Sequence, residues 1–218
     1  MTGPQLKISD DWIDKQDLRA DDLCPVLIRC PNIQYLYVCD CIINVSTLEW
    51  IVSQLKQIRC LSLIAIQGLN SLDWDRVWMA LAQNNLIHLT LSDNHFADIE
   101  ITDLIEKSKS LRELHLAYYR LHLTHLFNNL NQNFSKLSLI ECFRTNLNSL
   151  KALVYGKASN IQELVVYKVP TYDENILSDF IGIKMPQLKR FSYVFDSSVS
   201  TSKTITFIKT FKDFYPKL

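Results

Sequence analysis

The chain has 218 residues, 48% of them hydrophobic and 21% charged, and its 23 basic residues equal its 23 acidic residues. This composition is typical of a folded chain, and the balanced charge argues against a broad electrostatic surface for nucleic acid or membrane lipid. The sequence has no apolar run of the ~18 residues that a membrane span needs and no signal peptide at its start. We therefore expect a cytoplasmic or nuclear protein that is not secreted.

The cysteine spacing predicts neither a zinc site nor a disulfide framework. The sequence has no C-x-x-C pair, and a protein that is not secreted rarely keeps disulfides. We expect reduced, mostly buried thiols at Cys24, Cys30, Cys39, Cys41, Cys60 and Cys142.

One pattern recurs along the chain, L-x-x-L-x-L-x-x-N-x-L, and its clearest copy runs from Leu86 to Phe96. Leu6 and Ile8 fit the fourth and sixth positions of a partial first copy. The complete copies begin at Ile33, Ile58, Leu86, Leu111, Phe134, Ile161 and Leu188. Successive starts at 33, 58, 86, 111, 134, 161 and 188 are therefore 25, 28, 25, 23, 27 and 27 residues apart. These intervals fall within the range of leucine-rich repeats.

Apolar residues at positions 4 and 6 of each copy predict a short strand with one buried face. The remaining residues of each repeat leave room for a helix of two to four turns. We therefore predict an α/β leucine-rich-repeat solenoid, a horseshoe with parallel strands on its concave face and helices on its convex face. Residues 1–218 are expected to form a single repeat domain with about seven complete repeats and a partial repeat at each end.

The segments between the strands carry helix signals. The stretch from Ser46 to Glu49 reads as a capping box, and Ser71 reads as a cap of the helix that contains Trp74 and Trp78. The spacing of these tryptophans predicts that they fill the core between sheet and helix. Similar apolar spacing predicts helices around 104–105, 150–154 and 176–181.

The chain ends where another repeat would begin. Tyr215 to Leu218 matches the residues that open earlier repeats, and neither end carries an obvious polar cap. Solenoids need such caps, so we expect a fragment or part of a larger assembly. An uncovered last segment containing Phe207, Ile208, Phe211 and Phe214 would favour self-association.

Three features together resemble the repeat region of F-box/leucine-rich-repeat proteins: the openings Cys30-Pro31-Asn32-Ile33, Met185-Pro186-Gln187-Leu188 and Tyr215-Pro216-Lys217-Leu218, the cysteines at the ninth position (Cys41 and Cys142), and the period of about 26 residues. The resemblance implies repeats that recognise a substrate protein for ubiquitination, although the F-box itself is not found in this sequence. Ribonuclease-inhibitor-like and innate-immune-receptor-like repeats share the pattern and stay open as alternatives.

Catalytic motifs are missing from the sequence. The segment Gly156-Lys157-Ala158-Ser159 has the ending of a phosphate-binding loop but lacks the upstream glycine, because position 151 is Lys. No nucleophile is paired with a base, and the five histidines lack companions at metal-ligand spacing. We therefore expect a scaffold that binds protein, with no enzymatic activity, cofactor, metal, nucleic acid, membrane or small-molecule substrate.

The partner is expected on the exposed face of the strands, at positions 3, 5, 7 and 8 of each repeat. The candidate residues are Tyr35, Tyr37, His88, Glu113, His115, Tyr118, Ile140, Glu163, Tyr167, Arg190, Val194 and Phe195. Ser62, Ser92, Ala117 and Ser138 are expected on the same face. Aromatic side chains near an arginine are typical anchors of protein interfaces. The alternative is that some of these aromatic residues turn into the loop side of the solenoid.

Overall fold

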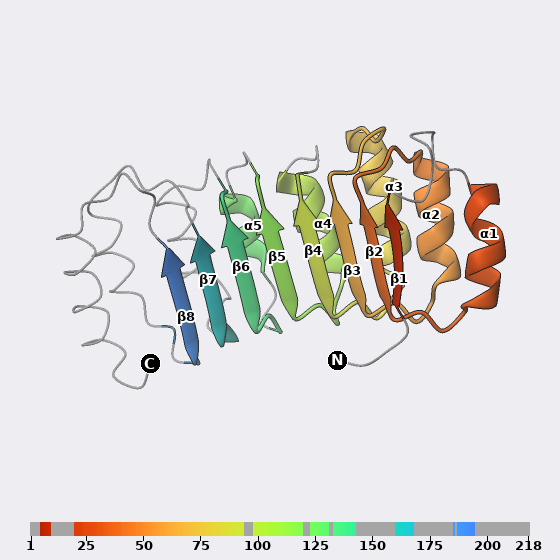
Figure 1. Ribbon diagram of the computed structural model, residues 1–218. Helices are drawn as coiled ribbons and strands as arrows, with labels where there is room; N and C mark the ends of the chain where they lie inside the picture. The colour runs from red at the N-terminus through yellow and green to blue at the C-terminus, as the bar shows by residue number, and fades with distance from the viewer. Residues whose placement is uncertain are drawn as a thin grey trace. The chain divides into compact units, whose positions relative to one another are not determined.

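The computed structural model describes residues 5–9, 20–93, 98–119, 123–130, 133–142, 160–167, 185 and 187–194. The chain divides into two compact units, 1–114 and 115–218, which are treated separately below. Within each unit, short strands alternate along the chain with helices or connecting segments (Figure 1).

The first unit contains four parallel strands whose order in the sheet follows their order in the chain. They are β1 (Gln5–Ser9), β2 (Tyr35–Cys39), β3 (Cys60–Ile64) and β4 (His88–Ser92). The register aligns equivalent repeat positions, so Leu36 pairs with Leu61 and Leu61 pairs with Leu89. Leu6 pairs with Leu36, which confirms the partial first repeat. The parallel pairing confirms the predicted leucine-rich-repeat solenoid.

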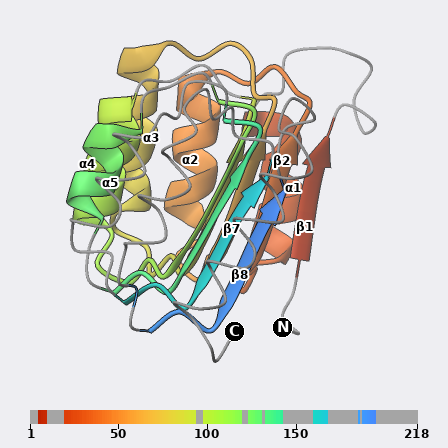
Figure 2. The ribbon, with the colours of Figure 1, turned by 90° about the vertical axis from the view of Figure 1, so that its left-hand side faces the viewer.

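The helices of the first unit are α1 (Ala20–Arg29), α2 (Val45–Gln54), α3 (Ser71–Leu81) and α4 (Asp98–Lys107). Consecutive helices pack against each other. Figure 2 shows α2, α3 and α4 on the same side of the strands of this unit. Among the described residues, no helix covers the other side of these strands.

The second unit repeats the arrangement. Its strands β6 (Lys136–Ile140), β7 (Glu163–Tyr167) and β8 (Arg190–Val194) pair in parallel and in chain order. The helix α5 (Thr124–Asn129) precedes β6. The strand β5 (Glu113–Ala117) begins in the first unit and ends in the second. Every described strand starts at position 3 of its repeat, as the pattern predicts.

The strands form because their alternating leucines can all be buried on one face. Positions 4 and 6 are at most 1% exposed from β2 to β7, for example Leu89 at 0% and Leu114 at 1%. Complete burial of one such side chain contributes about 1.5–3 kcal/mol. The equivalent residues of β8, Phe191 and Tyr193, are partly buried and their ring centroids lie 6.0 Å apart.

Backbone hydrogen bonds join each repeat to the next at both ends of its strand. Before the strand, the carbonyl at position 2 accepts two N–H groups of the following repeat; the Gln34 carbonyl accepts from Arg59 and Cys60. After the strand, the N–H at position 8 donates to the carbonyl at position 7 of the following repeat. The Ala65 N–H donates to Ser92 O at 2.9 Å, and the Tyr118 N–H donates to Ile140 O at 2.8 Å.

The second of these bonds comes with a left-handed backbone at position 8. Five non-glycine residues at this position have φ between 49° and 59°: Asp40, Ala65, Asp93, Tyr118 and Glu141. Aspartate tolerates this conformation, but alanine, tyrosine and glutamate gain nothing from it locally. The hydrogen bond to the next repeat therefore holds these residues in a strained conformation.

Replacing Ala65 with glycine is therefore expected to stabilise the protein. The left-handed conformation costs a non-glycine residue about 1–2 kcal/mol, whereas glycine adds about 0.4–1 kcal/mol of entropy to the unfolded chain. We expect Ala65→Gly to raise the free energy of unfolding by about 0.5–1 kcal/mol. The matched variant Ala80→Gly, within α3, should lower it by about 0.5–1 kcal/mol. Urea titrations in which both variants have a lower free energy of unfolding than the wild type would contradict the strain at Ala65.

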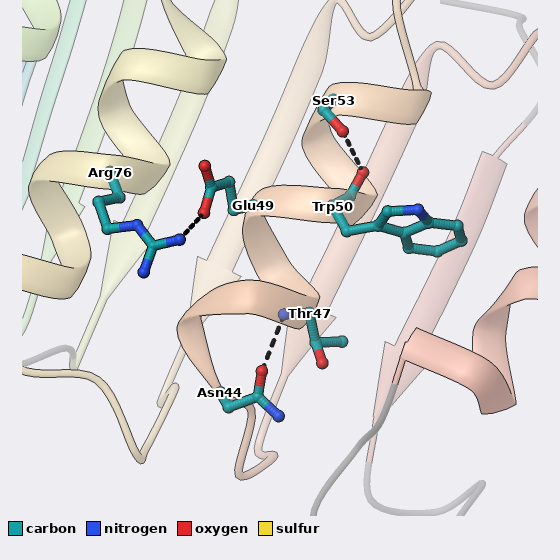
Figure 3. Close-up of polar contacts among 6 residues, drawn as sticks. All are labelled: Asn44, Thr47, Glu49, Trp50, Ser53 and Arg76. Carbon is teal, nitrogen blue, oxygen red and sulfur yellow. Dashed lines mark hydrogen bonds and ion pairs between the residues drawn. The ribbon is translucent and has the colours of Figure 1, made fainter.

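Asparagines form the N-caps of α2 and α3. Asn44 precedes α2, and its Oδ1 accepts a hydrogen bond from the Thr47 N–H at 2.8 Å (Figure 3). Asn70 precedes α3 and forms a reciprocal capping box with Asp73. The predicted caps, Ser46 and Ser71, are wrong because the helices begin earlier than expected; both serines lie inside the first turn.

The predicted core tryptophans are confirmed. Trp74 and Trp78 are each 1% exposed and stack with ring centroids 4.9 Å apart. On the outer surface of α2 and α3, Arg76 forms an ion pair with Glu49, and the Ser53 hydroxyl donates to the Trp50 carbonyl (Figure 3). The helices thus present large apolar side chains to the sheet and charged side chains outward.

Candidate protein-binding surface

The candidate surface is the side of each sheet that carries strand positions 3, 5 and 7. Side chains alternate along a strand, so these positions point away from the buried leucines. The two units carry different side chains on this face. The first unit presents aromatic and polar residues, and the second presents a row of charges and a strip of apolar residues.

In the first unit, His88 lies at the centre of a small polar network. Its Nδ1 lies 3.0 Å from Glu113 Oε2, and its Nε2 lies 2.9 Å from Thr90 Oγ1. The imidazole ring thus contacts a polar side chain through each nitrogen, and this arrangement fixes its orientation. Tyr35 and Tyr37 lie two strands away on β2, with Tyr37 38% exposed.

Cys60 lies between these two groups, in register with both Tyr35 and His88. Burial raises the pKa of the Cys60 thiol, and the nearby Glu113 carboxylate raises it further, while Arg59 lowers it. A raised pKa keeps the sulfur protonated and suppresses its nucleophilicity. Despite its histidine neighbour, Cys60 therefore lacks the character of a catalytic thiol.

In the second unit, one acidic side chain lies between two basic ones at position 3. Glu163 Oε2 is 3.4 Å from Lys136 Nζ, and Glu163 Oε1 is 3.2 Å from Arg190 Nη2. The Arg190 side chain is 79% exposed and that of Glu163 24%. The row carries two cations and one anion, so it presents a net positive charge to a partner.

At the ends of β5, β6, β7 and β8, four large side chains form a strip at positions 7 and 8. The apolar strip consists of Tyr118, Ile140, Tyr167 and Val194. Ile140 pairs with Tyr167 and Tyr167 pairs with Val194 in the sheet register, while the Tyr118 backbone bonds to Ile140. Tyr118 is 50% exposed and Val194 40% exposed, so at least these two side chains do not turn into the core.

Several residues expected on this face are buried instead. Ser92 is 7% and Ala117 4% exposed at position 7, and Ser62 and Ser138 are 6% and 5% exposed at position 5. Their side chains are short, and larger residues on adjacent strands cover some of them; Ser62 lies between Tyr37 and Thr90 in the register. His115 is partly buried in the second unit. Phe195 lies outside the described residues.

Three further residues at positions 3 and 5 were expected on this face by their place in the repeat, but only the structure shows their contacts. Thr90 fixes one His88 nitrogen, Lys136 pairs with Glu163, and Cys60 separates the tyrosines from His88. All three occupy positions 3 or 5. Opposite charges at equivalent positions of successive repeats were the available signal for the pair formed by Lys136 and Glu163.

Buried cysteines contribute to the turn that follows the strands. The Cys142 thiol lies 3.6 Å from Leu116 O and 3.6 Å from Ile140 O, and burial raises its pKa to about 12. Cys39 Sγ lies 3.7 Å from Ile8 O. None of the five cysteines with described side chains forms a disulfide. These thiols act as weak donors to backbone carbonyls in the interior.

The described residues contain neither a cluster of metal ligands nor a helix that could span a membrane. No group of three or more His, Cys, Asp or Glu side chains in these parts of the chain is placed to hold a metal ion. No helix within the same residues has the length and apolar character to cross a membrane.

No protein-family model matches the sequence, and no curated protein matches it either. Solved structures with a similar arrangement include the C-terminal domain of Caenorhabditis elegans tropomodulin, with 13% identity and a TM-score of 0.44 over 79% of this chain and 94% of that one. An internalin from Listeria monocytogenes has 15% identity and a TM-score of 0.46, over 85% of this chain and 54% of that one. A chain of the yeast Rad7 and Elc1 complex has 10% identity and a TM-score of 0.40, over 90% of this chain and 72% of that one. The described strands of this chain are themselves arranged as leucine-rich repeats.

Proposed function

We propose that this chain is a protein-binding module whose partner docks on the apolar strip of the second unit. The observation that carries the proposal is the apolar strip. Tyr118 and Val194 are large side chains that remain 50% and 40% exposed, whereas the residues at positions 4 and 6 of β6 and β7 are fully buried. Exposed aromatic and aliphatic groups in a contiguous row are typical of interfaces.

The charged row, formed by Lys136, Glu163 and Arg190, can orient a partner on this surface. Arg190 and Lys136 lie at position 3 and the strip at position 7, so the two rows are about 13 Å apart along the strands. A partner that places apolar side chains on the strip can place a carboxylate near Arg190. Such rim charges set the register of docking and the rate of association more than the affinity.

We further propose that the module recognises the substrates of an F-box-type ubiquitin ligase. The support is the sequence resemblance in the repeat openings, together with cysteines at the ninth position. Cys142 contacts the carbonyl groups that an asparagine would satisfy in that turn. Co-purification of the full-length gene product with the linker subunit of such ligases tests this role separately from binding itself.

The experiment on the strip compares captured proteins between matched variants. Tyr118→Ser with Val194→Ser removes the exposed parts of the strip. Leu72→Ser with Met79→Ser removes two apolar side chains of α3 that are 77% and 62% exposed. All four positions are at the surface, so each change should alter stability by about 0.5 kcal/mol or less.

We expect quantitative mass spectrometry to find at least one protein that the wild type and the α3 variant capture but the strip variant does not. The strip variant should lose this partner because truncating an interface anchor costs about 2 kcal/mol or more. Equal capture by all three proteins would refute the strip as the docking site.

A further inference from the structure

We propose that the first unit has a second binding surface, which takes an acidic segment of a partner protein. This surface, the basic edge, consists of Arg29, Lys56, Arg59, Lys109 and Arg112. These residues lie in the turns that lead from helices into strands, at the lower ends of the arrows in Figure 1. It is separate from the apolar strip and does not depend on the function proposed for the strip.

The backbone places these turns side by side. The Gln34 carbonyl accepts from the Arg59 N–H, the Arg59 carbonyl accepts from the Ile87 N–H, and the Ile87 carbonyl accepts from the Arg112 N–H. The turns therefore follow one another along one edge of the sheet, and the cations lie on either side of the turn at 82–87, which carries no charge. Lys56 and Lys109 occupy equivalent positions two repeats apart, and so do Arg59 and Arg112.

The charge of this edge has one sign. The turns at 29–34, 54–59, 82–87 and 107–112 contain no aspartate or glutamate. Three other cations have a carboxylate partner: Arg76 pairs with Glu49, Lys107 with Asp103 and Arg190 with Glu163. Within the described residues, no carboxylate lies within ion-pair distance of Arg29, Lys56 or Arg59. These three exposed cations are available to an outside anion.

Helix stabilisation accounts for only part of the row. A cation in the last turn of a helix interacts favourably with the helix dipole, and Arg29 ends α1 in this way. Arg112 donates to the carbonyls of Lys109 and Leu111, which supports the local turn. Arg59 lies five residues after the end of α2, beyond the range of that effect. Its charge therefore has no structural role in the helix.

The spacing favours an extended acidic peptide over a nucleic acid. Neighbouring strands lie about 4.8 Å apart, so equivalent cations two repeats apart are separated by about 10 Å. Carboxylates three residues apart in a polyproline II segment lie on one side of it, about 9 Å apart, which is close to this separation. Binding of single-stranded nucleic acid relies on aromatic stacking, and the four turns contain no aromatic residue.

The test uses fluorescence anisotropy with the full chain and a labelled peptide that has glutamate at every third position among serines. We expect saturable binding that weakens between about 50 and 200 mM salt. Lys56→Glu with Arg59→Glu should weaken it about tenfold, because two attractive pairs become repulsive. Lys56→Arg should bind like the wild type.

The control is Lys7→Glu with Arg76→Glu, which changes the net charge equally on exposed cations outside the basic edge. It should reduce binding much less. An equal loss in the control would show a general charge effect and overturn the proposal. So would the absence of peptide binding at low salt, or tighter binding of a twelve-nucleotide oligothymidylate than of the acidic peptide.

Discussion

Leu89→Asp is expected to abolish the cooperative thermal melt of this protein, whereas Thr90→Asp should leave it nearly unchanged. Leu89 is fully buried, with register partner Leu61 on the adjacent strand. An unpaired carboxylate at this position costs several kcal/mol after relaxation. That cost is a large share of the 5–15 kcal/mol that stabilises a typical domain.

Thr90 is the control because it is the next residue on the same strand and points to the opposite face. Its hydroxyl lies 2.9 Å from His88 Nε2, and a carboxylate there can accept a hydrogen bond from that nitrogen when the ring is protonated. Leu114→Asp and His115→Asp repeat the comparison on β5. Circular dichroism melts of the four variants give the answer, and equal stability in all four would mean that the register is off by one residue.

Trp78→Ala has the second-largest expected effect, a loss of about 3–5 kcal/mol in the free energy of unfolding. The indole is 1% exposed and stacks on Trp74 at 4.9 Å. Its removal leaves a cavity between α3 and the sheet and deprives Trp74 of its ring partner. The cost combines lost transfer energy with the cavity term, because the neighbouring side chains relax only partly.

Trp50→Ala supplies the comparison, because this tryptophan lies on α2 and is only partly buried. We expect a loss well below that of Trp78→Ala, measured by guanidinium titration with unchanged slope. If the two substitutions cost the same, the tryptophans of α3 do not form the core that the structure assigns to them.

The strands could be predicted residue by residue because one periodicity controls them. A one-residue slip would expose every leucine, so the positions of Leu36, Leu61 and Leu89 specify the register. Equivalent repeat positions then align without further information, including Leu6 in the partial first copy. That residues 1–218 form one repeat domain stays a prediction.

The first residue of each helix was harder to predict because several neighbouring side chains are suitable N-caps. Asn44, Ser46 and Thr47 are all suitable residues within four positions, and only the backbone decides that Asn44 accepts from the Thr47 N–H. The left-handed backbone conformation at Ala65, Tyr118 and Glu141 could not be predicted from the sequence either. Their conformation comes with a bond to the next repeat, which is a tertiary effect that local sequence does not encode.

The candidate surface could be predicted as a set of positions but not as a set of contacts. Alternation placed Tyr37 and Val194 on an accessible side, and Tyr118 is exposed at position 8, just after its strand. It did not predict that Ser62 and Ser138 would be buried, because that depends on the size of side chains across the strand. The basic edge was not predicted from the sequence, because its cations lie in turns outside the strand positions that the repeat pattern defines.

Binding of a captured partner to the purified chain tests the central claim most directly, and isothermal titration calorimetry measures it. The account predicts that Tyr118→Ser weakens the affinity about thirty-fold, equivalent to about 2 kcal/mol, while Met79→Ser on α3 leaves it unchanged. Unchanged affinity in Tyr118→Ser, or an equal loss in Met79→Ser, would contradict a partner docked on the apolar strip.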